Sequence, residues 1–201
     1  MTETGNTIPH SYVLPIPNGW HEIPAPGSGA DAAIRSLAER LAPRKESVEP
    51  LRFALAGVVE LSTMLKPGPR RNYALVVDAD QGIADALMSI RLSRVAPEAF
   101  GQYLAAIESS TSLDPKIETV TRTVTELTLQ AGPAILLKDV TVKREQEGLI
   151  AGAIERALLS VFVSEAPAML EILVATRNLA RFHDIGEYTR VVAAAYGPDG
   201  A

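Results

Sequence analysis

The stretch that decides the fold runs from Arg156 to Gly197 and reads RALLSVFVSEAPAMLEILVATRNLARFHDIGEYTRVVAAAYG. Two apolar runs, Ile154 to Val163 and Ala168 to Thr176, are each short enough for one strand, and a tight turn joins them. Consecutive strands with a short link favour an antiparallel pair. Apolar residues then recur at helical spacing until Gly197 and Pro198 end a last helix. This stretch predicts how a core is buried, and it contains no catalytic motif.

The rest of the chain adds further strands and helices by the same spacing rules. Helices are expected over 31–42, 49–66 and 97–109, and strands over 73–77, 86–93, 116–129 and 134–143. Asp31 is expected to cap the first helix. Residues 86–93 alternate strictly, which predicts one buried and one mostly wet face. The pattern indicates an α+β fold, an antiparallel sheet of about six to seven strands flanked by about four helices.

Residues Tyr12 to Pro17 are apolar and contain two prolines, so we expect an extended edge strand there. With 201 residues and 47% hydrophobic content, the chain is long enough for one sizeable core. We expect a flexible N-terminal leader over 1–11, a single α+β domain over 12–197 and a C-terminal tail over 198–201.

Charge and cysteine content exclude several classes of function. The formal net charge of -5 opposes binding to nucleic acid, which needs a clustered positive face. The chain has no cysteine, so disulfides and thiolate metal sites are excluded. No signal-peptide pattern and no uninterrupted run of about 18 apolar residues occurs, so no membrane partner is expected. We expect a cytoplasmic protein.

The chain carries no common catalytic or cofactor motif. The chain lacks the Gly-x-Ser-x-Gly turn of hydrolases, the His-Glu-x-x-His pair of zinc proteases and glycine-rich phosphate loops. The segment Asp78 to Gly82 begins like a calcium loop but lacks its later oxygen ligands, so we interpret it as a hairpin turn. Only His10, His21 and His183 are histidines, and nothing in their placement indicates a metal site. We expect no cofactor and no metal.

The best polar cluster for acid-base work is His183, Asp184 and Glu187. His183 and Glu187 share a helix face if the last helix starts early. The alternative is that Asp184 caps this helix and Glu187 lies favourably at its positive end. Glu60, in the second helix, is interpreted as a boundary carboxylate near solvent or an arginine.

Four residues are candidates for contacting another protein: Tyr12, Trp20, Arg70 and Arg71. Tyr12 and Trp20 are amphipathic aromatics beside rigid prolines, and such residues are enriched at protein contacts. The alternative for Trp20 is a lid over the sheet. The two arginines form a small basic loop suited to a carboxylate or phosphate, or simply a solvated loop. The threonine-rich strand from Thr119 to Thr125 is a possible edge for strand addition, unless Arg122 and Glu126 block it.

Several turns, taken with the order of elements, resemble a known superfamily. They are Pro17-Asn18-Gly19-Trp20 after a strand, a hairpin near 73–95, Ala131-Gly132-Pro133, and a last hairpin leading into a helix at Asn178-Leu179. Over most of its length the chain resembles the Mog1/PsbP-like α/β superfamily, in particular its actinobacterial members. The resemblance implies a central antiparallel sheet flanked by helices, and binding to other proteins rather than catalysis.

The first hypothesis is therefore a non-catalytic intracellular module that binds another protein, as an adaptor or accessory subunit. A second is a small-molecule binding protein or enzyme with a cleft near His183, Asp184 and Glu187. A third is a self-assembling structural subunit, a homo-oligomer in which the alanine-rich end of the last helix packs against a copy of itself.

Overall fold

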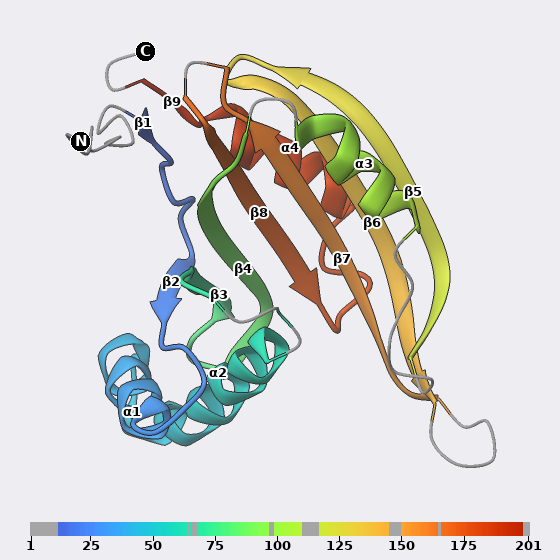
Figure 1. Cartoon of the computed structure of the whole chain (residues 1–201). Helices are drawn as coiled ribbons and strands as arrows, with labels where there is room; N and C mark the ends of the chain where they lie inside the picture. Colours follow the sequence, from blue (N-terminus) through green and yellow to red (C-terminus); the bar gives the residue numbers. More distant parts are fainter. Residues whose placement is uncertain are drawn as a thin grey trace.

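A single seven-stranded antiparallel sheet organises the protein (Figure 1). The computed structural model describes residues 12–63, 65, 68–96, 99–109, 117–144, 150–164 and 166–198. The strand order is β2-β3-β4-β8-β7-β6-β5, and every neighbouring pair is antiparallel. This arrangement confirms the α+β class predicted from the sequence.

The strands of the sheet are β2 (Trp20–Ile23), β3 (Arg71–Asp78), β4 (Ile83–Arg94), β5 (Ile117–Leu129), β6 (Gly132–Arg144), β7 (Ile150–Phe162) and β8 (Ala168–Thr176). The helices are α1 (Ala30–Leu41), α2 (Val48–Ser62), α3 (Ala99–Ser109) and α4 (Ile185–Ala194), with a short 3-10 turn, η1 (Lys45–Ser47), before α2. Two short strands, β1 (Tyr12–Val13) and β9 (Gly197–Pro198), pair with each other away from the main sheet.

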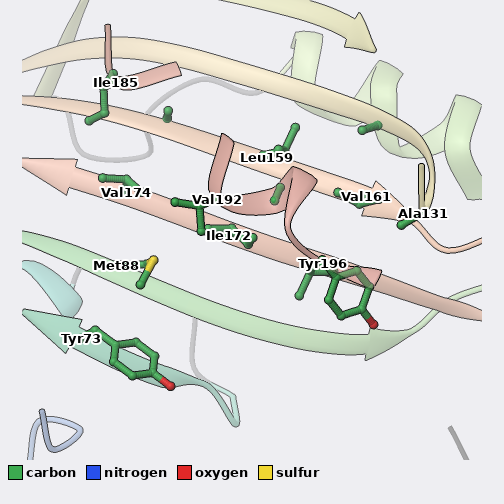
Figure 2. Close-up of a cluster of buried hydrophobic side chains, with 14 of the residues drawn as sticks. Tyr73, Met88, Ala131, Leu159, Val161, Ile172, Val174, Ile185, Val192 and Tyr196 are labelled. Carbon is green, nitrogen blue, oxygen red and sulfur yellow. The ribbon is translucent and has the colours of Figure 1, made fainter. Parts of the chain in front are cut away.

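One face of the sheet is covered by α4, and the centre of this face is apolar. Ile185 and Val192 of this helix pack onto alternate residues of β8, including Ile172 and Val174 (Figure 2). Side chains at every second position of β8 therefore pack against side chains spaced three to four residues apart along α4. This layer forms the larger core, and it reaches Trp20 at the β2 edge.

The opposite face carries α1, α2 and α3, and its apolar packing is split in two. Leu51, Leu55 and Val58 of α2 pack with α1 onto the β2 to β4 side of the sheet. Ile107 of α3 and its neighbours pack onto Phe162 and other residues of the β6 to β8 side. In Figure 1, α2 and α3 lie over separate parts of this face.

Three local predictions were wrong. Tyr12 to Pro17 does not form the sheet edge: only Tyr12 and Val13 form a strand, since the prolines that follow lack the N–H groups of a ladder. Leu14 and Ile16 instead pack against the α4-side core. The supposedly wet face of β4 is largely covered, with Leu87 and Ser89 buried. Finally, α1 begins at Ala30, and Asp31 lies in its first turn rather than capping it.

The predicted ends of the domain are only partly visible. The leader 1–11 lies outside the described residues, as do residues 199–201 of the predicted tail. Pro198, the first residue of that tail, pairs with Tyr12. The chain ends on either side of the domain are therefore brought together by a short two-stranded ladder.

Candidate functional site

The His183, Asp184 and Glu187 cluster lies at the start of α4. Asp184 caps this helix: its Oδ1 accepts hydrogen bonds from the N–H groups of Gly186 at 2.8 Å and Glu187 at 3.1 Å. Lys138 Nζ also donates to Asp184 at 3.2 Å. These contacts, led by the Glu187 N–H, lower the pKa of Asp184. The interpretation of Asp184 as a helix cap is confirmed.

The other two members of the cluster do not converge on Asp184. Glu187 binds Arg190, whose Nε donates to Oε2 at 2.7 Å, and this bond lowers the pKa of Glu187. His183 is exposed. A general acid at neutral pH needs a raised carboxyl pKa, and both carboxyls have lowered ones.

The four candidate protein-contact residues are dispersed. Trp20 is buried at 6% exposure, and its Nε1 donates to Tyr188 Oη at 2.6 Å. Its ring therefore belongs to the core, as in the lid interpretation. Tyr12 lies in β1, paired with Pro198. Arg71 is exposed and donates to Glu22 at 2.8 Å.

Arg70 lies apart from its neighbour Arg71. Arg71 is opposite Ile90 in the β3 and β4 register, and Ile90 packs into the α4-side core. Successive residues of an extended chain point to opposite faces, so Arg70 is directed to the α2 and α3 side. There, burial and the charge of Arg91 lower the pKa of Arg70, whereas Glu171 acts in the opposite direction.

The remaining sequence candidates have structural roles. Asp78 Oδ1 accepts from the N–H groups of Asp80 and Gln81, which confirms the hairpin turn. Glu60 is exposed and pairs with Arg177 at 3.4 Å, as expected of a boundary carboxylate. His10 lies outside the described residues. The described part of the chain brings together no group of three potential metal ligands.

The feature with the clearest binding potential is the free edge of β5. In the described chain, β5 pairs with β6 alone and is the last strand of the sheet (Figure 1). From Thr121 to Leu129, nine consecutive residues keep an unbroken antiparallel register with Val140 to Gly132. Alternate residues of such a strand direct their N–H and C=O groups away from β6. This row of main-chain groups is a template for another strand.

The side chains of β5 leave this edge accessible. Thr121, Thr123 and Thr125 are exposed. They are paired with Val140, Lys138 and Leu136, so they lie on the α4 side of the sheet. Each is β-branched and polar, a combination that suits an exposed strand.

A buried ion pair cluster anchors β5 from within. The side chain of Asp139 in β6 is 0% exposed. Its Oδ2 accepts from Arg156 Nη2 of β7 at 2.8 Å and from Arg122 Nη2 of β5 at 3.3 Å. The hydrogen bonds that Arg156 donates to Asp139 raise the pKa of Arg156. Arg122 thus points inward and does not block the edge, whereas Glu126 is exposed.

The sequence had suggested the threonine strand as an edge, and the structure places it there. What the sequence did not show is Asp139 as the anchor, since Lys138-Asp139 reads as an ordinary polar pair. The cross-strand row Arg122, Asp139, Arg156 exists only once β5, β6 and β7 are in register.

These features define an α+β protein built on one antiparallel sheet with one long free edge. No protein-family model matches the chain, and no curated protein matches it. A similar solved structure is that of LpqN, described as involved in cell envelope biogenesis of Mycobacterium tuberculosis. It has a TM-score of 0.35 and 13% sequence identity, and the match covers 92% of this chain and 76% of that chain. Within the described residues, no helix is both long and apolar enough to cross a membrane.

Proposed function

We propose that this chain is a non-catalytic module that binds another protein by adding a strand of the partner to the edge of β5. The observation that carries the proposal is the regular run from Thr121 to Leu129, paired on one side only among the described residues. Main-chain hydrogen bonds supply the affinity in this mode, and side chains on alternate positions supply the selectivity.

Most of the devices that protect an edge lie at one end of β5, and Glu126 is an exposed charge within the regular part. A register shift between Thr119 and Thr121 marks a bulge, and Glu118 next to it pairs with Arg144. Bulges and charges of this kind disfavour strand addition. Beyond Thr121 the register is regular, so docking is confined to the segment Thr121 to Leu129.

The chemistry of this segment specifies the partner. The exposed threonine row favours β-branched residues at alternate positions of the docked strand, because such cross-strand pairs stabilise a sheet. Glu126 is exposed and favours a lysine or arginine opposite it. The expected partner is therefore an extended, threonine- or valine-rich segment with one basic residue.

The resemblance to the Mog1/PsbP-like superfamily and its actinobacterial members agrees with this proposal, because it implies protein binding. A cytoplasmic location is part of the same proposal, and cell fractionation tests it. Two alternatives stay predictions. One is an enzyme or ligand site near His183, Asp184 and Glu187, and the other is a self-assembling subunit.

Amide hydrogen exchange tests the proposal directly. The protein is purified from its host with its stoichiometric partner, and exchange is compared between the free protein and the complex. We expect the amides of Thr121 to Leu129 to become protected in the complex. The double variant Thr123→Lys/Thr125→Lys should weaken the complex at least tenfold, because lysines on an edge disfavour strand addition.

A matched control separates this effect from added charge. Thr63→Lys places a lysine at another exposed threonine, the C-terminal cap of α2, and should leave binding unchanged. Unchanged exchange of the β5 amides in the complex would refute the proposal. A concentration-dependent increase in mass by sedimentation, lost in the double variant, would favour self-assembly instead.

A further inference from the structure

The outward face of α2 carries an aromatic side chain that the fold leaves mostly uncovered. Phe53 is 66% exposed, and the guanidinium of Arg52 lies over its ring at 4.6 Å from the ring centroid. Glu49, Gly57 and Glu60 lie on the same helix face as Phe53, because the spacings between these residues are three or four. A single exposed ring is common on protein surfaces, so its surroundings decide what it means.

A hollow of about 280 Å³ opens within one helical turn of this ring. One side of the hollow is lined by Ala54, Gly57, Val58 and Leu61 of α2. The other side is formed by the start of β4 and by the two residues that follow β8. The hollow is slightly smaller than the roughly 300–1,000 Å³ of small-molecule sites, so a protein side chain is the better occupant.

The polar wall of the hollow has already used most of its hydrogen-bonding groups. Asp85 accepts from Arg181 Nη2 at 2.7 Å and from Asn178 Nδ2 at 3.0 Å. Asn178 Oδ1 accepts from the N–H group of Ala180 at 3.2 Å. These bonds hold the wall in place and leave few polar groups for an occupant. The hollow therefore suits an apolar side chain.

Gly57 keeps the hollow open although it weakens the helix. Glycine inside a helix is destabilising relative to alanine, so its presence there calls for a reason. The packing of the chain itself does not require it: among the described residues, a Cβ at Gly57 would meet only Arg177 Nη1, at 3.9 Å. That is an ordinary contact distance. A side chain at this position would instead take up the space of the hollow.

The ring and the hollow share one helix face, which makes this face complementary to itself. In a dimer with a two-fold axis, residue i of one copy contacts residue j of the other, and j contacts i. If two α2 helices pack antiparallel with the axis between Phe53 and Gly57, each Phe53 lies opposite the Gly57 of the other copy. Both rings then fill both hollows. A different protein would have to supply its own apolar side chain and would not use Phe53 in this way.

The charges at the rim are compatible with a second copy. Glu49 near the start of α2 pairs with Arg52 at 2.9 Å, and Glu60 near its end pairs with Arg177 at 3.4 Å. Each end of the face thus carries one acidic and one basic group. In an antiparallel pair the end of one helix faces the start of the other, so Arg177 comes beside Glu49 of the second copy. This charge complementarity favours the antiparallel arrangement.

We propose that the outward face of α2 is a self-association surface, at which two copies of this chain form a two-fold dimer with each Phe53 ring in the hollow of the other copy. Gly57 keeps the hollow open, and Arg177 lies at its rim. The surface is separate from the β5 edge and from the alanine-rich end of α4. It does not depend on the proposed function.

Sedimentation equilibrium of the purified full chain, from micromolar to millimolar concentration, tests the proposal. We expect the mean mass to rise from that of one chain toward that of two. Phe53→Ala should weaken association about tenfold or more, as expected for an aromatic side chain at the centre of an interface. In dilute solution, where the chain is monomeric, this variant should keep wild-type stability, because the ring is exposed there. A mass of one chain at every concentration would overturn the proposal and leave a different protein as the occupant of the hollow.

Gly57→Leu blocks the hollow and keeps the ring. Association should fall about tenfold or more, while the melting temperature of the monomer should rise, because leucine is more favourable than glycine in a helix. Association that survives Gly57→Leu unchanged would contradict the hollow as the binding site.

An equal mixture of Phe53→Ala and Gly57→Leu chains tests the symmetry of the contact. One chain keeps the hollow and the other keeps the ring, so a mixed pair regains one of the two contacts. We expect the mixture to associate more strongly than either variant alone. A mixture as weak as the separate variants would overturn the two-fold arrangement.

Two controls distinguish this face from the other candidate surfaces. Val191→Ala shortens a side chain with 56% exposure on α4, and Thr123→Lys/Thr125→Lys alters the β5 edge. Both variants should associate like the wild type. Loss of association in Val191→Ala would assign the dimer to α4, and loss in the double variant would assign it to β5. Either result would overturn the proposal.

Discussion

The two edges of the sheet are stabilised in opposite ways. The β2 edge is four residues long and is followed directly by Pro24, and its Trp20 and Ile23 are buried. The β5 edge is thirteen residues long, and its threonines from Thr121 onward are exposed. Large side chains turned into the core hold β2, whereas β5 is held by partly buried apolar side chains together with a buried carboxylate one strand further in.

This difference indicates which edge is available for binding. A short strand bounded by proline offers few free main-chain groups, so β2 is a poor template for another strand. Asp139 anchors β5 from the inside, and the outer main-chain groups of β5 pair with no other described strand.

The largest expected effect is at the β2 edge. Trp20→Ala should lower the free energy of unfolding by about 4–5 kcal/mol, because it removes a buried ring and its hydrogen bond to Tyr188. Urea unfolding followed by circular dichroism measures this loss. Phe53→Ala is the control, since Phe53 is an aromatic residue with 66% exposure and should have little effect. A loss below about 1 kcal/mol for Trp20→Ala would show that burial does not hold β2.

The next effect concerns the anchor of β5. Asp139→Ala should cost about 3–4 kcal/mol, because it leaves the guanidinium of Arg156 partly buried without its carboxylate. Hydrogen exchange should show β5 opening before the rest of the sheet. Glu118→Ala removes a carboxylate from the exposed pair of Glu118 in β5 with Arg144 in β6, and the urea midpoint of this variant should hardly change. Equal losses of stability in Asp139→Ala and Glu118→Ala would contradict the role of Asp139 as the anchor of β5.

The smallest expected effect is the change in stability with pH that comes from the two exposed ion pairs. Arg71 lowers the pKa of Glu22 at the β2 edge, and Arg144 lowers the pKa of Glu118 at the β5 edge. A lowered folded-state pKa contributes stability above the usual glutamate value of 4.5, and this contribution is lost as the pH falls through the folded-state value.

Urea midpoints of the wild type, Glu22→Gln and Glu118→Gln, measured between about pH 6 and 3, check this prediction. Each variant should differ slightly from the wild type at pH 6 and converge with it at low pH. High salt should reduce both differences, because the pairs are exposed. Differences that grow as the pH falls would contradict the assigned sign.

Much of the fold was predictable because local spacing reports local structure. The short apolar run in residues 168–176 and the helical spacing in α4 predicted elements that form the largest core. The prediction for Tyr12 to Pro17 was wrong because an extended, proline-containing segment packs equally well without ladder hydrogen bonds. Asp184 as a helix cap was predictable, since capping is a local interaction.

The candidate sites were less predictable, because their residues are distant in sequence. Arg91 and Glu171 belong to β4 and β8 and form an ion pair only after these strands pair. Asp139 becomes an anchor only between Arg122 and Arg156. Residue spacing alone carries no information about such cross-strand partners.

The sequence by itself determined the class of the fold, the positions of its main strands and helices, and the absence of common catalytic motifs. The tertiary structure alone decided the strand order, the identity of the two edges and the burial of both faces of β4. The physical reason is that alternation along a strand specifies which face each side chain takes, but not which strand lies beside it. Neighbouring strands are chosen by the packing of the whole core.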